Sequence, residues 1–150
     1  MALRCGGMAN RSALTAVSAV QLAAGLAGQV VALRRRRPYD IPFMHGSPDH
    51  IARDSLWFGA SYSAPVYMTG SQAWAVVRLA RRPDERARKI LRLLGTSMIS
   101  GYLLERFNRK LLTPAGFDPL ETPIVAVGLA GSVAMAVLGR PGRQSLGARP

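Results

Sequence analysis

An uncharged run of 22 residues, residues 12–33, is followed at once by four consecutive arginines, residues 34–37. A helix needs about 20 apolar residues to cross the hydrocarbon core of a bilayer, so this run is long enough to span it. Clustered arginines are typical of the point where a span meets water. Three further apolar stretches, residues 56–77, 90–104 and 123–139, repeat the pattern, and the helix of the middle one can continue to Leu112, which gives a span over about 90–112. The sequence therefore predicts an all-α polytopic membrane protein, a compact bundle of four transmembrane helices.

The second stretch is unusually polar for a span. Trp57 and Trp74 lie about 25 Å apart along a helix, a spacing that matches aromatic belts at two opposite interfaces. Pro65, between them, predicts a kink. The many hydroxyl and amide side chains in its interior favour a helix that faces a bundle or a cavity. The alternative is three spans, with residues 56–77 as a re-entrant or interfacial segment.

Capping residues and small residues predict how the helices begin and pack. Asp84 and Glu85 suit the first turn of the third helix, and Thr122 is a natural N-cap for the fourth. Small residues four positions apart let helices approach closely. Three such pairs occur: Ala24 with Gly28, Ser97 with Gly101, and Gly128 with Ser132. Gln21 and Gln29 lie at membrane depth, where we expect them to bond to a neighbouring helix.

The distribution of Lys and Arg predicts the orientation in the membrane. These residues number 2 before the first span, 5 in the first loop, 7 in the second, 3 in the third and 3 in the tail. Positive charge favours the cytoplasmic side. Four spans with an inside N-terminus place 12 inside and 8 outside, whereas three spans with an outside N-terminus place 15 inside and 5 outside. Both arrangements place the second loop and the C-terminus in the cytoplasm.

Composition limits the classes of partner. The net charge is +12, mostly from arginine, and the mean hydropathy is +0.11. The arginines flank apolar segments without interleaved aromatic residues, so we expect contact with anionic lipid headgroups and no nucleic-acid binding. We expect one membrane domain over residues 1–139, a basic disordered tail over residues 140–150, and a multi-pass location in a bacterial cell membrane.

The first loop holds the most reactive group of residues. His45, Asp49, His50 and Asp54 lie within ten positions, and imidazole with carboxylate suits both general acid–base chemistry and zinc ligation. Their spacing matches no known signature, and the aspartates also suit turns and helix caps. The only cysteine, Cys5, permits neither an intramolecular disulfide nor a thiolate cluster. We expect no metal and no cofactor.

A polar stripe in the second stretch is the other candidate site. Ser61, Pro65, Met68 and Gln72 recur on one helical face, and Tyr62 and Tyr67 add hydroxyl groups nearby. This face either lines a cavity for a lipid-like ligand or forms hydrogen bonds between helices.

Two ionisable residues, Arg92 and Glu105, border the third stretch and are also candidates for ligand contact. An interfacial ion pair of Glu105 with Arg109 would explain that carboxylate without a ligand.

The sequence favours a small, non-catalytic integral membrane protein that binds lipid or assembles with membrane proteins or with copies of itself. A membrane enzyme acting on a lipid or isoprenoid-like substrate is one alternative. A subunit of an oligomeric transporter or channel is another.

Overall fold

The computed structural model describes residues 2–36, 40–42, 44–45 and 64–141. These residues are mainly helical, as predicted, and include one short antiparallel hairpin. The elements in chain order are α1 (Ala2–Arg34), β1 (Asp40–Ile41), β2 (Met44–His45), α3 (Val66–Arg81), α4 (Glu85–Leu104), α5 (Arg106–Leu111), the 3-10 helix η2 (Pro114–Gly116) and α6 (Glu121–Leu138).

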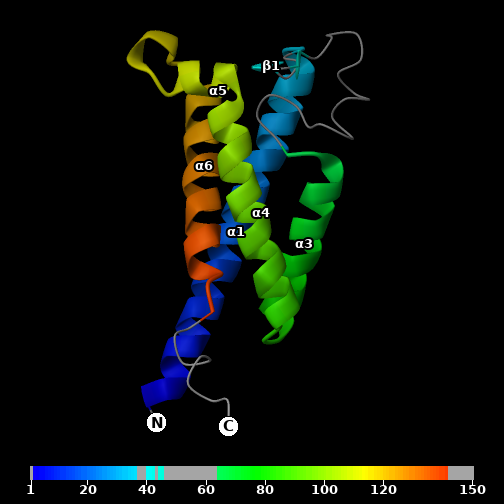
Figure 1. Ribbon diagram of the computed structural model, residues 1–150, viewed down its shortest axis with the longest axis vertical. Coiled ribbons are helices and arrows are strands. Elements are labelled where there is room, and N and C mark those ends of the chain that lie inside the picture. The colour runs from blue at the N-terminus through cyan, green and yellow to red at the C-terminus, as the bar shows by residue number, and fades with distance from the viewer. Residues whose placement is uncertain (1, 37–39, 43, 46–63, 142–150) are drawn as a thin grey trace.

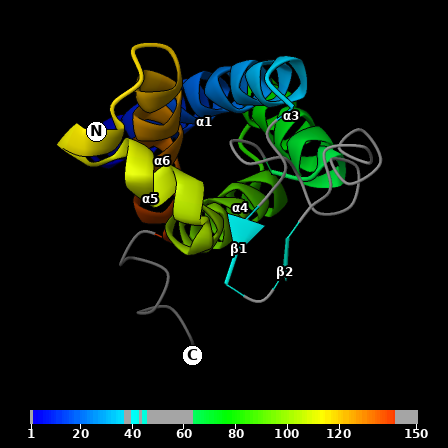
Figure 2. The ribbon, with the colours of Figure 1, turned by 90° about the horizontal axis from the view of Figure 1, so that it is seen from above.

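Four long helices form an up-down bundle, in which α1 and α4 run one way and α3 and α6 run the other (Figure 1). Both α1 and α4 contact α3 and α6, so the four helices enclose a shared interior (Figure 2). The last turn of α1, the hairpin, α5 and the start of α6 lie at one end, which we name the hairpin end. The α3–α4 turn and the last turn of α6 lie at the other, which we name the basic end.

Two helices have the length and apolarity of membrane spans, α1 over Asn10–Arg34 and α6 over Glu121–Leu138. Among the other described helices, α3 has 16 residues, and α4 carries five charged residues in its first eight positions. Length and composition therefore identify two candidate spans and leave α3 and α4 to be judged from their packing.

The predicted bounds of the second and third helices need correction. Pro65 does not kink α3, because it is the N-cap residue immediately before Val66. Its fixed φ and missing N–H are compatible with that position. The third helix is interrupted at Glu105, whose ψ of 115° is extended and separates α4 from α5. The expected helix over residues 90–112 is therefore two helices, and it begins earlier, where the Asp84 carboxylate accepts hydrogen bonds from the N–H groups of Arg86 and Ala87.

The start of α6 also differs from the prediction. Thr122 is not the N-cap, since the helix begins at Glu121 with Leu120 as its N-cap. The Asp118 carboxylate caps it instead, because its Oδ1 accepts hydrogen bonds from the N–H groups of Leu120 and Glu121 at 2.9 Å each. The Thr122 hydroxyl donates to the Leu111 carbonyl and accepts from the Asp118 N–H, which ties α6 to the preceding loop.

Small residues set the close approach of α4 and α6. A Cβ atom on Gly95 would lie 2.7 Å from the Ser132 carbonyl oxygen, and one on Gly128 would collide with the Tyr102 ring. The predicted pair Gly128 and Ser132 therefore lies at a helix contact and is confirmed. The pair Ser97 and Gly101 is wrong, because both residues are exposed and Gly101 has nothing within 4 Å of its Cβ direction.

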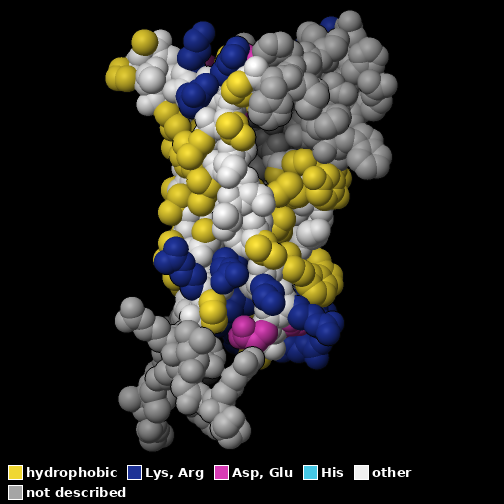
Figure 3. All heavy atoms as spheres, viewed as in Figure 1, with side chains coloured by type: hydrophobic (Ala, Val, Ile, Leu, Met, Phe, Trp, Pro, Cys, Tyr) yellow, Lys and Arg dark blue, Asp and Glu magenta, His cyan; other side chains and the backbone are white. Residues whose placement is uncertain are grey.

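The outer surface is apolar on all four long helices. Large hydrophobic side chains exposed by 38–59% lie on each of them: Val20, Leu26, Val30 and Leu33 on α1; Val66, Tyr67, Trp74 and Val77 on α3; Leu93, Leu103 and Leu104 on α4; Val127, Val133 and Val137 on α6. Figure 3 shows such side chains between two charged ends of the molecule. Exposed apolar side chains on every long helix are typical of protein or lipid contact.

Candidate functional site

A buried polar cluster connects three helices in the middle of the bundle. Gln72 of α3 donates hydrogen bonds to the Gln21 Oε1 atom at 2.6 Å and to the Ser18 carbonyl oxygen at 2.9 Å, both on α1. Gln21 in turn donates to the Ser132 Oγ atom at 3.5 Å, and the Ser132 hydroxyl donates to the Gly128 carbonyl on α6 at 2.8 Å. The donors therefore form one chain from α3 through α1 to α6.

The fourth long helix, α4, contributes softer partners to this cluster. The Gln21 Nε2 atom lies 3.3 Å from the Met98 sulfur, and its side chain also interacts with Tyr102. Gln21, Gln72 and Ser132 are all at most 2% exposed. A buried amide without partners costs free energy, so these side chains stabilise the bundle by satisfying one another.

The polar stripe predicted on the second stretch divides between two surfaces. Gln72 and Met68 point into the bundle, where Met68 packs against the core. Tyr67 is 59% exposed on the outer surface, away from that face. Ser61 and Tyr62 lie outside the described residues. Among the candidates in this segment that the structure describes, Gln72 has the most hydrogen bonds to other helices.

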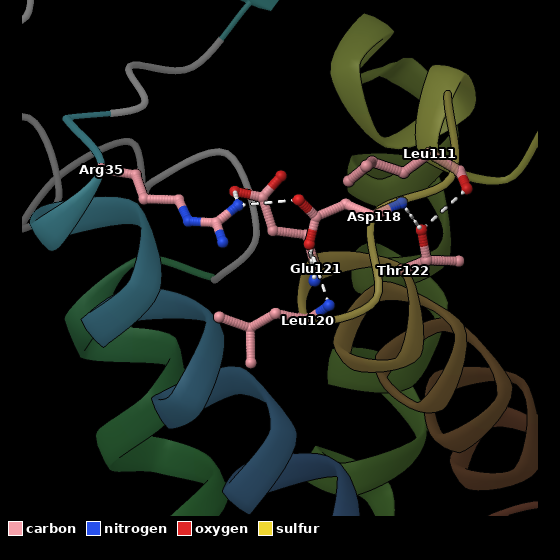
Figure 4. Close-up of polar contacts among 6 residues, drawn as sticks. All are labelled: Arg35, Leu111, Asp118, Leu120, Glu121 and Thr122. Atoms are coloured by element: carbon pink, nitrogen blue, oxygen red, sulfur yellow. Dashed lines mark hydrogen bonds and ion pairs between the residues drawn. The ribbon is translucent and has the colours of Figure 1, made fainter. Parts of the chain in front are cut away.

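A charged cluster lies at the hairpin end (Figure 4). The Arg35 Nη1 atom, just after α1, lies 2.9 Å from the Asp118 Oδ2 atom and 2.7 Å from the Glu121 Oε1 atom. Glu121 is 1% exposed, whereas the Arg35 side chain is 37% exposed. Arg35 therefore supplies positive charge from the surface to a buried carboxylate at the start of α6.

Hydrogen bonding stabilises the ionised form of Asp118. The backbone N–H of Glu121, the Arg35 guanidinium and the backbone N–H of Leu120 lower the pKa of Asp118 to about 2. Hydrogen bonds to Asp118 and Glu121 raise the pKa of Arg35 above its usual value. One arginine and one aspartate thus join the end of α1 to the start of α6.

Two predicted site residues from distant parts of the sequence lie near each other at this end. The backbone N–H of Asp40 donates to the Glu105 Oε1 atom at 2.8 Å, and the hairpin register pairs Asp40 with His45. The predicted ion pair of Glu105 with Arg109 is wrong, because Arg109 makes no ion pair among the described residues. Asp49, His50 and Asp54 lie outside the described residues.

A buried amide lies close to this contact. Asn108 of α5, which contacts β1, is 2% exposed, and its Oδ1 atom has no partner among the described residues. Within the described part of the chain, no group of three His, Cys, Asp or Glu side chains is arranged to hold a metal ion. Arg92 lies at the opposite, basic end of α4, where its Cβ approaches Gly139.

Sequence reasoning did not identify Arg35, Asp118 or Glu121 as a cluster. Arg35 stands among four similar arginines, and Asp118 stands in a Pro- and Gly-rich loop 83 positions away. The two acidic residues could have indicated a charged contact, because Asp118 and Glu121 stand next to the start of an apolar span.

Comparisons of the chain with protein-family models, with curated proteins and with solved structures found no match.

Proposed function

We propose that the chain is a four-span integral membrane protein with a non-catalytic, lipid-binding role. The observation that carries this proposal is an apolar outer surface around an interior that contains a hydrogen-bonded polar cluster. The interior holds Gln21, Gln72 and Ser132, which bond to one another, whereas large apolar side chains are exposed on all four long helices. Lipid is a solvent in which such a surface is stable and unpaired polar groups are not.

Helix length supports a full span for α1, and arginine side chains at the basic end support spans for the shorter α3 and α4. The uncharged residues 12–33 of α1 extend about 33 Å as a helix, close to the roughly 30 Å of a hydrocarbon core. The uncharged parts of α3 and α4 are shorter, but Arg78 and Arg92 border them at the basic end. A long arginine side chain can place its guanidinium at the interface while its backbone lies within the hydrocarbon core. The Arg78 guanidinium lies 5.6 Å from the Trp74 ring centre, a pairing suited to that interface.

Charge favours a cytoplasmic location for the basic end. The α3–α4 region from Arg78 to Arg92 contains seven Lys and Arg residues and two acidic residues. The start of α1 and the last turn of α6 lie at the same end (Figure 1). An up-down bundle with both chain ends inside satisfies the positive-inside tendency at that end.

Two measurements test this proposal. Alkaline carbonate extraction should leave the protein in the membrane fraction, and its release into the soluble fraction would contradict an integral location. For topology, single cysteines replace Arg36, Arg82 or Ala115 in a Cys5→Ser background. Four spans predict that an impermeant maleimide labels positions 36 and 115 in intact cells, and position 82 only after lysis. Labelling of 115 but not 36 in intact cells would support three spans instead.

The hairpin end supports a second candidate function, a membrane enzyme acting on a lipid-like substrate. The observation in its favour is that the backbone of Asp40 pairs with His45 and donates a hydrogen bond to Glu105. Lipid profiling of cells that overproduce the protein tests it. An enzyme should change the lipid composition with wild type and not with His45→Ala or Glu105→Gln at equal abundance. No change with wild type would leave the non-catalytic role.

A further inference from the structure

A cationic cavity lies at the basic end, between the first two turns of α4 and the end of α6. Its volume is about 250 Å³, and its lining is Glu85, Arg86, Arg88, Lys89, Arg92, Gly139 and Pro141. Four of these side chains are positively charged and one is negatively charged. The cavity therefore has the volume and the charge to take a small anion with part of the molecule to which it is attached.

Three of the four cations have no anionic partner within the part of the chain that the structure describes. Arg88 lies 3.7 Å from Glu85, one turn away, and is 17% exposed. Arg86, Lys89 and Arg92 make no ion pair among the described residues. Like charges so close together repel one another, and an anion between them would remove that repulsion. The cavity is thus short of negative charge.

The helical repeat directs several of these groups to one side of α4. Glu85, Lys89 and Arg92 are spaced at i, i+4 and i+7, which places them on one face of the helix. The end of α6 closes that face from the other side. A Cβ atom on Gly139 would lie 2.7 Å from the Arg92 Cβ atom, so only glycine allows this approach. The half-buried stem of Arg92 consequently forms part of the cavity wall.

The level of the cavity along the bundle indicates which kind of anion it would meet. The apolar part of α6 ends at Leu138, and the uncharged part of α4 begins at Leu93, both next to the cavity. In a four-span bundle this level is the membrane interface, where lipid phosphates lie. The anionic leaflet is also the cytoplasmic one, the side assigned above to the basic end.

We propose that this cavity binds the phosphate of an anionic lipid headgroup, with Arg86, Lys89 and Arg92 as its cationic partners. The proposal rests on the four-span integral function proposed above and adds the class of lipid and its site. Arginine and lysine both bind phosphate, arginine through its planar guanidinium and lysine as a point charge.

The test compares two pairs of substitutions that remove equal charge from the same end of the molecule. Lys89→Gln with Arg92→Gln changes the cavity. Arg81→Gln with Arg82→Gln changes exposed arginines of the α3–α4 region outside the cavity lining. Each full-length protein, in nanodiscs of phosphatidylcholine, is titrated with fluorescent phosphatidylglycerol. The competitors are unlabelled phosphatidylcholine, glycerol phosphate and inorganic phosphate.

We expect wild type and the Arg81/Arg82 variant to bind phosphatidylglycerol with similar affinity, and the Lys89/Arg92 variant to bind at least tenfold more weakly. Equal losses in both variants would overturn the proposal in favour of general surface charge. Binding of inorganic phosphate that displaces the lipid at equal concentration would overturn the lipid source. Carbonate extraction of each variant separates the two proposals. A protein that stays in the membrane but does not select phosphatidylglycerol contradicts the headgroup site and leaves the integral membrane function in place.

Discussion

Gln72 and Gln21 are joined by a 2.6 Å hydrogen bond between α3 and α1, although 51 positions separate them in the chain. Each amide has a second connection, Gln72 to the Ser18 carbonyl and Gln21 to the Ser132 hydroxyl. This bond therefore lies at the centre of a network that reaches three helices. The bundle interior depends on the two amides acting together.

Removing either amide should cost stability, and removing both should cost less than the sum. Gln72→Leu leaves the Gln21 Oε1 atom without its donor. Gln21→Leu leaves the Gln72 Nε2 group without that acceptor. We expect a coupling free energy of about 0.6 kcal/mol, the average for hydrogen bonds between membrane helices. Reversible unfolding in mixed micelles measures it. Gln29→Leu is the matched control, since Gln29 has no side-chain hydrogen bond within the described region. If the free-energy losses of Gln21→Leu and Gln72→Leu add exactly in the double variant, the coupling is contradicted.

Adding one methyl group should separate α4 from α6 at Gly95 and have no such effect at Gly101. The new Cβ in Gly95→Ala would lie 2.7 Å from the Ser132 carbonyl oxygen and 2.9 Å from the Ala136 nitrogen, both backbone atoms. Overpacking of this kind costs about 1 to 3 kcal/mol. Gly101→Ala has open space and gains helix propensity, so its unfolding free energy should stay equal or rise. Equal melting temperatures of the two variants would argue against this helix contact.

Loss of Arg35 should destabilise the protein more than loss of its neighbour Arg36. Arg35→Gln removes the guanidinium that lies 2.7 Å from the Glu121 carboxylate, which is 1% exposed. Because the Glu121 carboxylate is buried, loss of this guanidinium should lower the midpoint of chemical unfolding. Arg36 is exposed and makes no ion pair among the described residues, so Arg36→Gln is the charge-matched control. Chemical unfolding of both variants decides the comparison.

Acid should weaken the contact between α1 and α6 through Asp118. Its pKa is about 2 in the folded protein, below the usual value near 4, because the Glu121 and Leu120 N–H groups and Arg35 stabilise the carboxylate. A depressed folded pKa contributes stability above the unfolded pKa, and this contribution is lost as the pH falls from about 4 to 2. Asp118→Asn keeps an acceptor for the helix cap and removes the charge. Its melting temperature should therefore fall less steeply over this range than that of wild type, and parallel curves would exclude Asp118 as the source.

Trp74 should report lipid contact of α3. It is 46% exposed on the outer surface, one turn before Arg78. In a Trp57→Phe variant, which leaves one tryptophan, we expect quenching by lipids brominated near the headgroup to exceed quenching by lipids brominated near the chain end. Emission at long wavelength without quenching by either lipid would show that α3 faces water.

The sequence predicted features that depend on local composition. Residues 12–33 lie within α1, and residues 123–138 lie within α6, because uncharged apolar runs of that length favour a helix. Pro65 was misplaced as a kink, since a proline signal cannot by itself distinguish the interior of a helix from its start. The break at Glu105 was not predicted, because no Pro or Gly stands at that position. Its carboxylate accepts a hydrogen bond from Asp40, a partner 65 positions away.

The partners of the polar residues were also not predictable from local composition. Gln21 was expected to bond to a neighbouring helix and does so, whereas the same prediction for Gln29 is wrong, since its side chain has no hydrogen bond within the described residues. The face of Gln72 was left open between a cavity and a helix contact, and its amide bonds to α1. The partners of these amides depend on how each helix is rotated in the bundle. The Arg35, Asp118 and Glu121 cluster depends on the relative height of two helices that are far apart in sequence. Rotation and height are set by packing, and a single sequence lists the polar groups without stating which ones meet.

The donor chain from Gln72 through Gln21 to Ser132 has a consequence for biogenesis in the four-span arrangement. Helices that enter a bilayer in chain order do not meet their partners at the same time. Gln21 enters with α1, the Gln72 donor arrives with α3, and the Ser132 acceptor arrives only with α6. A nascent protein truncated before α6 would thus lack the Ser132 acceptor, and the Gln21 amide would have only its partners on α3 and α4. The polar network is therefore complete only once the last helix has joined the bundle.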